Sequence, residues 1–97
     1  MQEFIIFALD HTDEQAINRR LAVRPAHFDK VTELKKSGNF IIGAAILNAD
    51  GKMIGSNMIV RFENEAALQD YLKSEPYVTG KVWEKINTYP TKVANLE

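Results

Sequence analysis

The chain has 97 residues with 12 basic and 13 acidic side chains, so its formal net charge at pH 7 is −1. This length fits a single domain, residues 1–97, with one modest core. The near-neutral charge argues against nucleic-acid binding, and no stretch approaches the ~20 apolar residues of a membrane helix. The sequence has no cysteine, which excludes disulfides, thiol nucleophiles and thiolate metal sites. We expect a cytoplasmic protein without a nucleic-acid or membrane partner.

The first part of the chain predicts a strand followed by a helical region in two pieces. Residues 2–9 are short, β-branched and aromatic, which is typical of a strand. The polar stretch 10–13 can form a loop and cap a first helical piece. Pro25 disfavours helix at the residue before it and can open a new helix. We therefore expect a break there and a second helical piece that ends at the Ser-Gly pair 37–38.

Two further strands follow this helical region. Residues 40–47 form a second apolar run. The Asp50-Gly51 pair is typical of a two-residue hairpin turn and leads into a third strand over residues 53–63. Strands two and three should be antiparallel neighbours.

The last part of the chain predicts one more helix and one more strand. Asn64 can cap a helix over residues 65–73, where apolar side chains recur at helical spacing. Residues 74–77 contain a proline and break this helix. Residues 81–89 complete the chain as a fourth strand. The order is strand, helix, strand, strand, helix, strand.

This order predicts a ferredoxin-like α+β fold, βαββαβ, with a four-stranded antiparallel sheet and helices on one face. The other face of such a sheet usually shows a polar alternation. Residues 2–9 and 40–47 are instead apolar at nearly every position. We expect another copy of the sheet to cover that face, which gives a homodimer of the dimeric α+β barrel type or a higher oligomer.

His27 departs from the apolar pattern of its helix. At about 100° per residue, it falls near the middle of an apolar arc. The arc consists of Ala26, Phe28, Val31 and Leu34. A buried imidazole needs partners for its nitrogens, and Glu75, before a proline, is our first candidate. Asp10, after the first strand, is the competing one. A carboxylate on one nitrogen would fix the tautomer and leave the other nitrogen as a base.

Each of these residues also has a structural interpretation. Ser56 lies on the apolar face of the third strand beside Gly55, so it either lines a pocket or fills space with its hydroxyl bonded to backbone. Glu75 can be an exposed turn residue, and Asp10 can be a turn or cap residue. Tyr77 and a nearby tryptophan, Trp83, line a pocket or belong to the core.

The arginines also have both a functional and a structural interpretation, and the sequence argues against a metal site and a nucleotide site. Arg19, Arg20 and Arg24 can bind an anionic substrate or belong to a solvated helix face. The two histidines lie in different contexts without a close carboxylate cluster, which argues against a metal site. No glycine-rich loop precedes a helix, as a nucleotide site would need.

The motifs together resemble the YciI-like (YCII-related) proteins over almost the whole chain. The motifs are Arg20, Arg24-Pro25-Ala26-His27, Gly38 before a strand, Gly55-Ser56 in the third strand, and Glu75-Pro76-Tyr77 followed by Gly80. The resemblance implies a ferredoxin-like α+β dimer. Such proteins have been described as candidate enzymes because they share a histidine and an aspartate.

The resemblance also assigns positions in this sequence. The family histidine falls on His27 and the serine on Ser56. The aspartate falls on Glu75, whose longer side chain moves the carboxylate by about one methylene. Asp10 matches an acidic position that often follows the first strand in this family.

We therefore expect a small cofactor-independent enzyme of isomerase or lyase type. His27 would transfer a proton on a small cyclic or carboxylated organic molecule, with Glu75 or Asp10 orienting the imidazole. The side chains expected to hold the substrate are Ser56, Arg24 and Tyr77. No metal or cofactor is expected. The alternatives are a non-catalytic ligand-binding or regulatory dimer with the same pocket, and a structural dimer in which His27 is a core residue.

Overall fold

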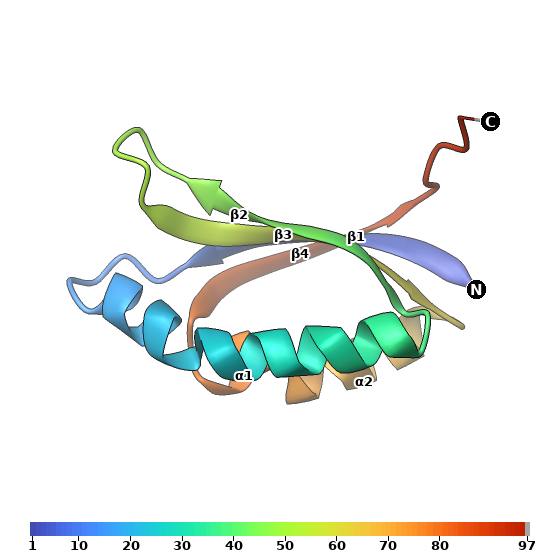
Figure 1. Cartoon of the computed structure of the whole chain (residues 1–97), viewed down its shortest axis with the longest axis horizontal. Helices are drawn as coiled ribbons and strands as arrows, with labels where there is room; N and C mark the ends of the chain where they lie inside the picture. Colours follow the sequence, from blue (N-terminus) through green and yellow to red (C-terminus); the bar gives the residue numbers. More distant parts are fainter. Residues whose placement is uncertain (97) are drawn as a thin grey trace.

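A four-stranded antiparallel sheet carries all the helices of this protein on one of its faces (Figure 1). The computed structural model describes residues 1–96. The elements are β1 (Gln2–Asp10), α1 (Ala16–Lys36), β2 (Phe40–Leu47), β3 (Met53–Phe62), α2 (Glu65–Ser74), α3 (Pro76–Thr79) and β4 (Trp83–Thr91). The strand order is β2-β3-β1-β4 with antiparallel pairing throughout. The predicted ferredoxin-like α+β fold is confirmed.

Helix α1 is continuous over 21 residues, so the predicted break at Pro25 is wrong. A proline inside a helix removes one backbone hydrogen bond and costs about 3 kcal/mol. The ring of Pro25 is exposed, whereas the buried side chains of α1 are Arg20, His27 and Leu34. These three residues follow one another at intervals of seven, so they project from one side of a single helix. Their contacts with the sheet and with the turn before α3 offset the cost of the proline.

The other predicted elements need small corrections. Asn64 caps α2 as expected, because its side chain accepts a hydrogen bond of 2.9 Å from the backbone N–H of Ala67. β2 and β3 are antiparallel neighbours, but residues 48–52 join them, so the turn is longer than two residues. The side chain of Asn48 fills this turn by accepting from the backbone N–H groups of Asp50 and Lys52. β4 lies two residues further along the chain than predicted.

The two faces of the sheet have different surroundings. The face toward the helices holds the core, which includes Phe4, Ile6, Ala8, Met58, Val60 and Phe62. The face away from the helices is also apolar, and on it Phe7, Ile42 and Tyr89 are 37%, 59% and 51% exposed. β1 and β2 therefore carry apolar side chains on both faces, as the sequence indicates for residues 2–9 and 40–47. Within residues 1–96, no helix is long and apolar enough to span a membrane.

Close approach of the two central strands depends on Gly55. This residue pairs with Leu9 across the β1–β3 ladder. A Cβ atom added to Gly55 would lie 2.4 Å from the carbonyl oxygen of Ala8. Only glycine allows this approach. The next residue in β3 is Ser56, so the constraint sits beside a candidate site residue.

We expect Gly55→Ala to lower the free energy of unfolding by about 1–3 kcal/mol, because a clash with backbone cannot be relieved by rotating a side chain. The control is Gly43→Ala, whose added Cβ would meet the movable ring of Phe40 at 3.1 Å and should cost less. Urea denaturation followed by circular dichroism measures both changes. Equal losses would contradict a steric role for Gly55.

Candidate active site

His27 and Glu75 form a buried pair between α1 and the turn that joins α2 to α3. Nδ1 of His27 lies 2.5 Å from Oε1 of Glu75. The Glu75 residue is 0% exposed and the His27 residue 7%. Because a carboxylate only accepts hydrogen bonds, Nδ1 donates the proton. No residue in the described part of the chain partners Nε2, so this nitrogen is available to a ligand.

Glu75 is held in place by the turn in which it lies. It is the N-cap of α3, and its Oε1 accepts a second hydrogen bond of 3.1 Å from the backbone N–H of Tyr77. Its Oε2 accepts from the hydroxyl of Tyr71, one turn earlier on α2. Burial, reinforced by the nearby Glu75 carboxylate, raises the pKa of Tyr71 far above its usual range. The Tyr71 hydroxyl therefore remains a donor to Glu75.

A second buried polar cluster joins α1 to the sheet. Nη1 of Arg20 donates to both carboxylate oxygens of Asp10, at 3.0 and 3.1 Å. Nη2 of Arg20 donates to Oγ of Ser56 at 2.9 Å, and Nε1 of Trp83 donates to the same oxygen at 3.1 Å. Burial raises the pKa of Asp10, and the Arg20 guanidinium opposes this shift. Asp10, the competing candidate partner for His27, thus contacts Arg20 instead.

Tyr77 connects the two clusters. Its ring stacks on the imidazole of His27 with centroids 4.0 Å apart and planes inclined by 15°. The guanidinium carbon of Arg20 lies 4.7 Å from the centroid of the same ring. Burial raises the pKa of the Tyr77 hydroxyl. The plane of the imidazole is therefore fixed by stacking as well as by its bond to Glu75.

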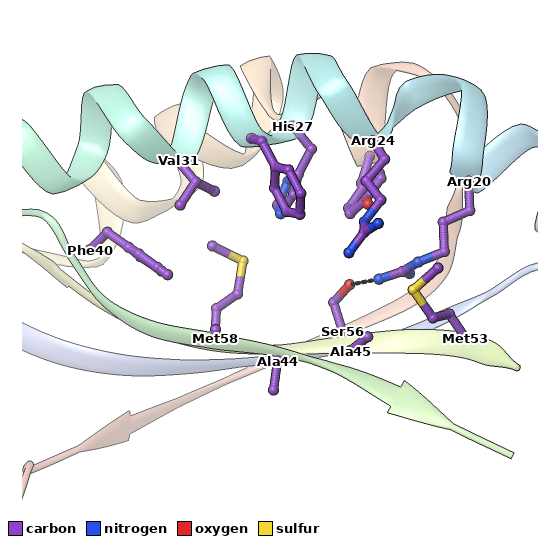
Figure 2. Close-up of a pocket in the computed structure, with 13 residues that line it drawn as sticks. Arg20, Arg24, His27, Val31, Phe40, Ala44, Ala45, Met53, Ser56 and Met58 are labelled. Carbon is purple, nitrogen blue, oxygen red and sulfur yellow. Dashed lines mark hydrogen bonds between the residues drawn. The ribbon is translucent and has the colours of Figure 1, made fainter. Parts of the chain in front are cut away.

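A pocket of about 200 Å³ lies between α1 and the sheet, next to these clusters. Figure 2 shows its two ends, with His27 between them. Val31, Phe40 and Met58 lie at one end, and Arg24, Arg20 and Ser56 lie at the other, beside Met53 and Ala45. Among residues 1–96, no group of three or more His, Asp or Glu is placed to hold a metal ion.

Four of the six predicted site residues line this pocket. They are His27, Ser56, Arg24 and Tyr77. Glu75 lies behind the imidazole and Asp10 lies behind Arg20, so neither forms the pocket wall.

Two residues of these clusters are not among the six predicted site residues. Tyr71, in α2, lies four residues before Glu75. Arg20 is predicted either to bind an anionic substrate or to lie on a solvated helix face, whereas it is buried, lies seven residues before His27 and shares its side of α1. In both cases, the helical spacing from a predicted site residue is the sequence signal that could have identified the residue.

The tautomer of His27 can be tested with Glu75→Gln. In the wild type we expect the neutral imidazole to carry its proton on Nδ1. A neutral amide accepts more weakly than a carboxylate, so in Glu75→Gln the Nδ1–H signal should move upfield and exchange faster. Long-range ¹H–¹⁵N NMR measures both effects. His11, whose side chain is 38% exposed, serves as the internal reference. A proton on Nε2 in the wild type, or no change in the variant, would contradict the pairing.

Comparisons with known proteins agree with the fold. The sequence pattern of the YCII-related domain matches residues 3–92. Protein YciI of Escherichia coli O6:H1 (strain CFT073) is 30% identical over 95 residues, which cover 92% of this chain and 95% of that protein.

Solved structures show the same architecture. One is the 5-chloro-2-hydroxyhydroquinone dehydrochlorinase TftG of Burkholderia phenoliruptrix AC1100, in complex with 2,5-dihydroxybenzoquinone. It has a TM-score of 0.83 at 20% identity and covers 95% of each chain. Another is a dimeric ferredoxin-like protein from Jannaschia sp. CCS1, with a TM-score of 0.59 at 15% identity over 96% of this chain and 100% of that one. With the family pattern spanning almost its entire length, the chain belongs to the YCII-related domain family.

Proposed function

We propose that the protein is a cofactor-independent enzyme in which His27 transfers a proton on a small organic molecule, in an isomerisation or an elimination. The observation that carries this proposal is the state of the imidazole. Its Nδ1 is bonded to a fully buried carboxylate, whereas its Nε2 has no partner among residues 1–96 and the residue lines a pocket. A base held in this way has a fixed tautomer and one reactive nitrogen.

In the proposed reaction, Nε2 of neutral His27 accepts a proton from the substrate. The imidazolium that forms is stabilised by Glu75, at 2.5 Å from Nδ1. In an isomerisation, His27 returns the proton to another atom of the substrate. In an elimination, a leaving group departs with its bonding electron pair while the base keeps the proton. Neither route needs an electron acceptor, and a positioned general base contributes about 10² to 10⁴ in rate.

Two further observations support small-molecule chemistry at this site. Ser56, Arg24 and Tyr77 line the same pocket as His27 and can hold a substrate against it. A dehydrochlorinase that was solved with a dihydroxybenzoquinone has the same fold. Loss of HCl from a chlorinated hydroquinone, in which a base takes a proton and chloride leaves with its bonding electron pair, is an elimination of the proposed type.

We expect His27→Asn to lower turnover by about 10² to 10⁴-fold, because it removes the base. The first substrate to test is 5-chloro-2-hydroxyhydroquinone, with chloride release as the assay. A panel of small hydroxylated rings and carboxylic acids in D₂O follows, with NMR detecting the loss or migration of carbon-bound protons. His11→Asn is the matched control and should keep full activity. Equal turnover by wild type and His27→Asn would refute the proposal, and ligand binding without any turnover would favour a binding module.

We also propose that two chains pair through the open face of the sheet. An apolar hollow of about 550 Å³ lies on that face, lined by residues that include Ile5, Phe7, Ile42, Ile59 and Tyr89. Exposed apolar patches of this kind are typical of interfaces. The likeness to solved proteins described as dimeric ferredoxin-like supports the pairing.

Ile42→Glu should convert the dimer to a monomer, because it buries a charge in the proposed interface. The measurement is light scattering coupled to size exclusion, with the mass expected to fall from two chains to one, 11.0 kDa. Leu21→Glu is the control, since Leu21 is also exposed, at 48%, but lies on α1. A wild type that is already monomeric, or a dimer that survives Ile42→Glu, would exclude this interface.

A further inference from the structure

The pocket beside His27 carries unbalanced positive charge. Its ionisable lining side chains are Arg20, Arg24, His27 and Tyr77, and no aspartate or glutamate lines it. The charge of Arg20 is balanced by its buried ion pair with Asp10. Arg24 forms no hydrogen bond or ion pair within the described residues, and its guanidinium carbon lies 4.7 Å from the ring centroid of Phe28. The charge of Arg24 is therefore available to a bound molecule.

The hydrogen bonds at the pocket also indicate that it binds a negatively charged or hydrogen-bond-accepting group. Oγ of Ser56 accepts from Arg20 and from Trp83, which uses both of its lone pairs. The Ser56 hydroxyl must then donate its own proton, and residues 1–96 supply no acceptor for it. Nε of Arg20 is also a buried donor without a partner in this part of the chain. Ser56, Arg24 and Arg20 thus offer only donors to the pocket, and two of these donors, the Ser56 hydroxyl and Nε of Arg20, are buried without an acceptor among residues 1–96.

The other end of the pocket is apolar. Val31, Phe40 and Met58 lie there, and His27 lies between the apolar and the donor ends (Figure 2). The pocket has a volume of about 200 Å³. For comparison, an apolar cavity of ~150 Å³ binds one benzene molecule. The pocket therefore fits one substituted six-membered ring or a short chain.

We propose that the substrate is a small organic anion, with a carboxylate or an acidic enol oxygen at Arg24 and Ser56 and its apolar part against Val31 and Met58. This inference rests on the proposed function and names its substrate class. An anion bound in this orientation places its central carbon beside His27. Arg24 is the residue that selects the anion, because it is the lining cation without a carboxylate partner in residues 1–96.

Benzoate and benzamide test the proposal, because they have nearly the same shape and differ by one negative charge. We expect wild-type protein to bind benzoate at least about tenfold more tightly than benzamide, as a charge-assisted hydrogen bond predicts. Isothermal titration calorimetry at millimolar ligand measures both. Arg24→Gln should weaken benzoate binding about tenfold and leave benzamide binding unchanged. Arg24 is exposed on α1, so this variant should keep the fold, which a thermal melt checks.

Lys36→Gln is the matched control. It removes the same charge from an exposed position in the last turn of the same helix, outside the pocket lining, and should change neither affinity. The proposal is overturned if benzoate fails to bind, or if benzamide binds equally well. It is also overturned if Arg24→Gln weakens both ligands alike, or if Lys36→Gln matches its effect, because the preference would then come from shape or from overall charge.

These binding measurements do not depend on turnover, so they separate the two proposals. An Arg24-dependent preference for benzoate, with no compound turned over, supports the anion site and refutes the proposed enzyme. Turnover that needs His27 but shows no preference for anions, in a protein that binds benzamide as well as benzoate, supports proton transfer and refutes the anion site.

Discussion

The arrangement of the helices depends on one fully buried carboxylate, that of Glu75. An ionised group removed from water costs several kcal/mol unless hydrogen bonds replace its hydration. Glu75 has three donors, one each from α1, α2 and the first turn of α3. The same contacts therefore hold all three helices together at one point and satisfy the charge. A chain of 97 residues has a small core, and we expect these buried contacts to favour one arrangement of its helices.

Two polar clusters meet at Tyr77, and the pocket lies beside their junction. One cluster joins α1 to the α2–α3 turn through His27, and the other joins α1 to the sheet through Arg20. Each places its charged acceptor behind the wall of the pocket and its donors or its base at the wall. Glu75 therefore orients the imidazole of His27, and Asp10 balances the charge of Arg20. Neither carboxylate lines the pocket.

The sequence predicts the fold because apolar runs, turn residues and the Asn64 cap are local signals that agree with one another. His27 was found because it interrupts an apolar arc. The break predicted at Pro25 is wrong, because the prediction used only the local effect of proline on the helix. In the structure, the buried side chains of Arg20 and Leu34, on either side of Pro25, keep α1 continuous. The choice between Glu75 and Asp10 could not be made, because it depends on where a turn meets a helix that lies 48 residues away in sequence.

The seven-residue spacing of Arg20 and His27 has a consequence for how this pocket can change size. A shift of α1 along its axis would break both polar clusters at once, so that wall is rigid. The opposite wall is formed partly by β2, an edge strand that contributes the small residues Gly43 and Ala45. In the proposed substrate pocket, the edge strand is therefore the wall at which a methyl group can be gained or lost without disturbing a buried charge.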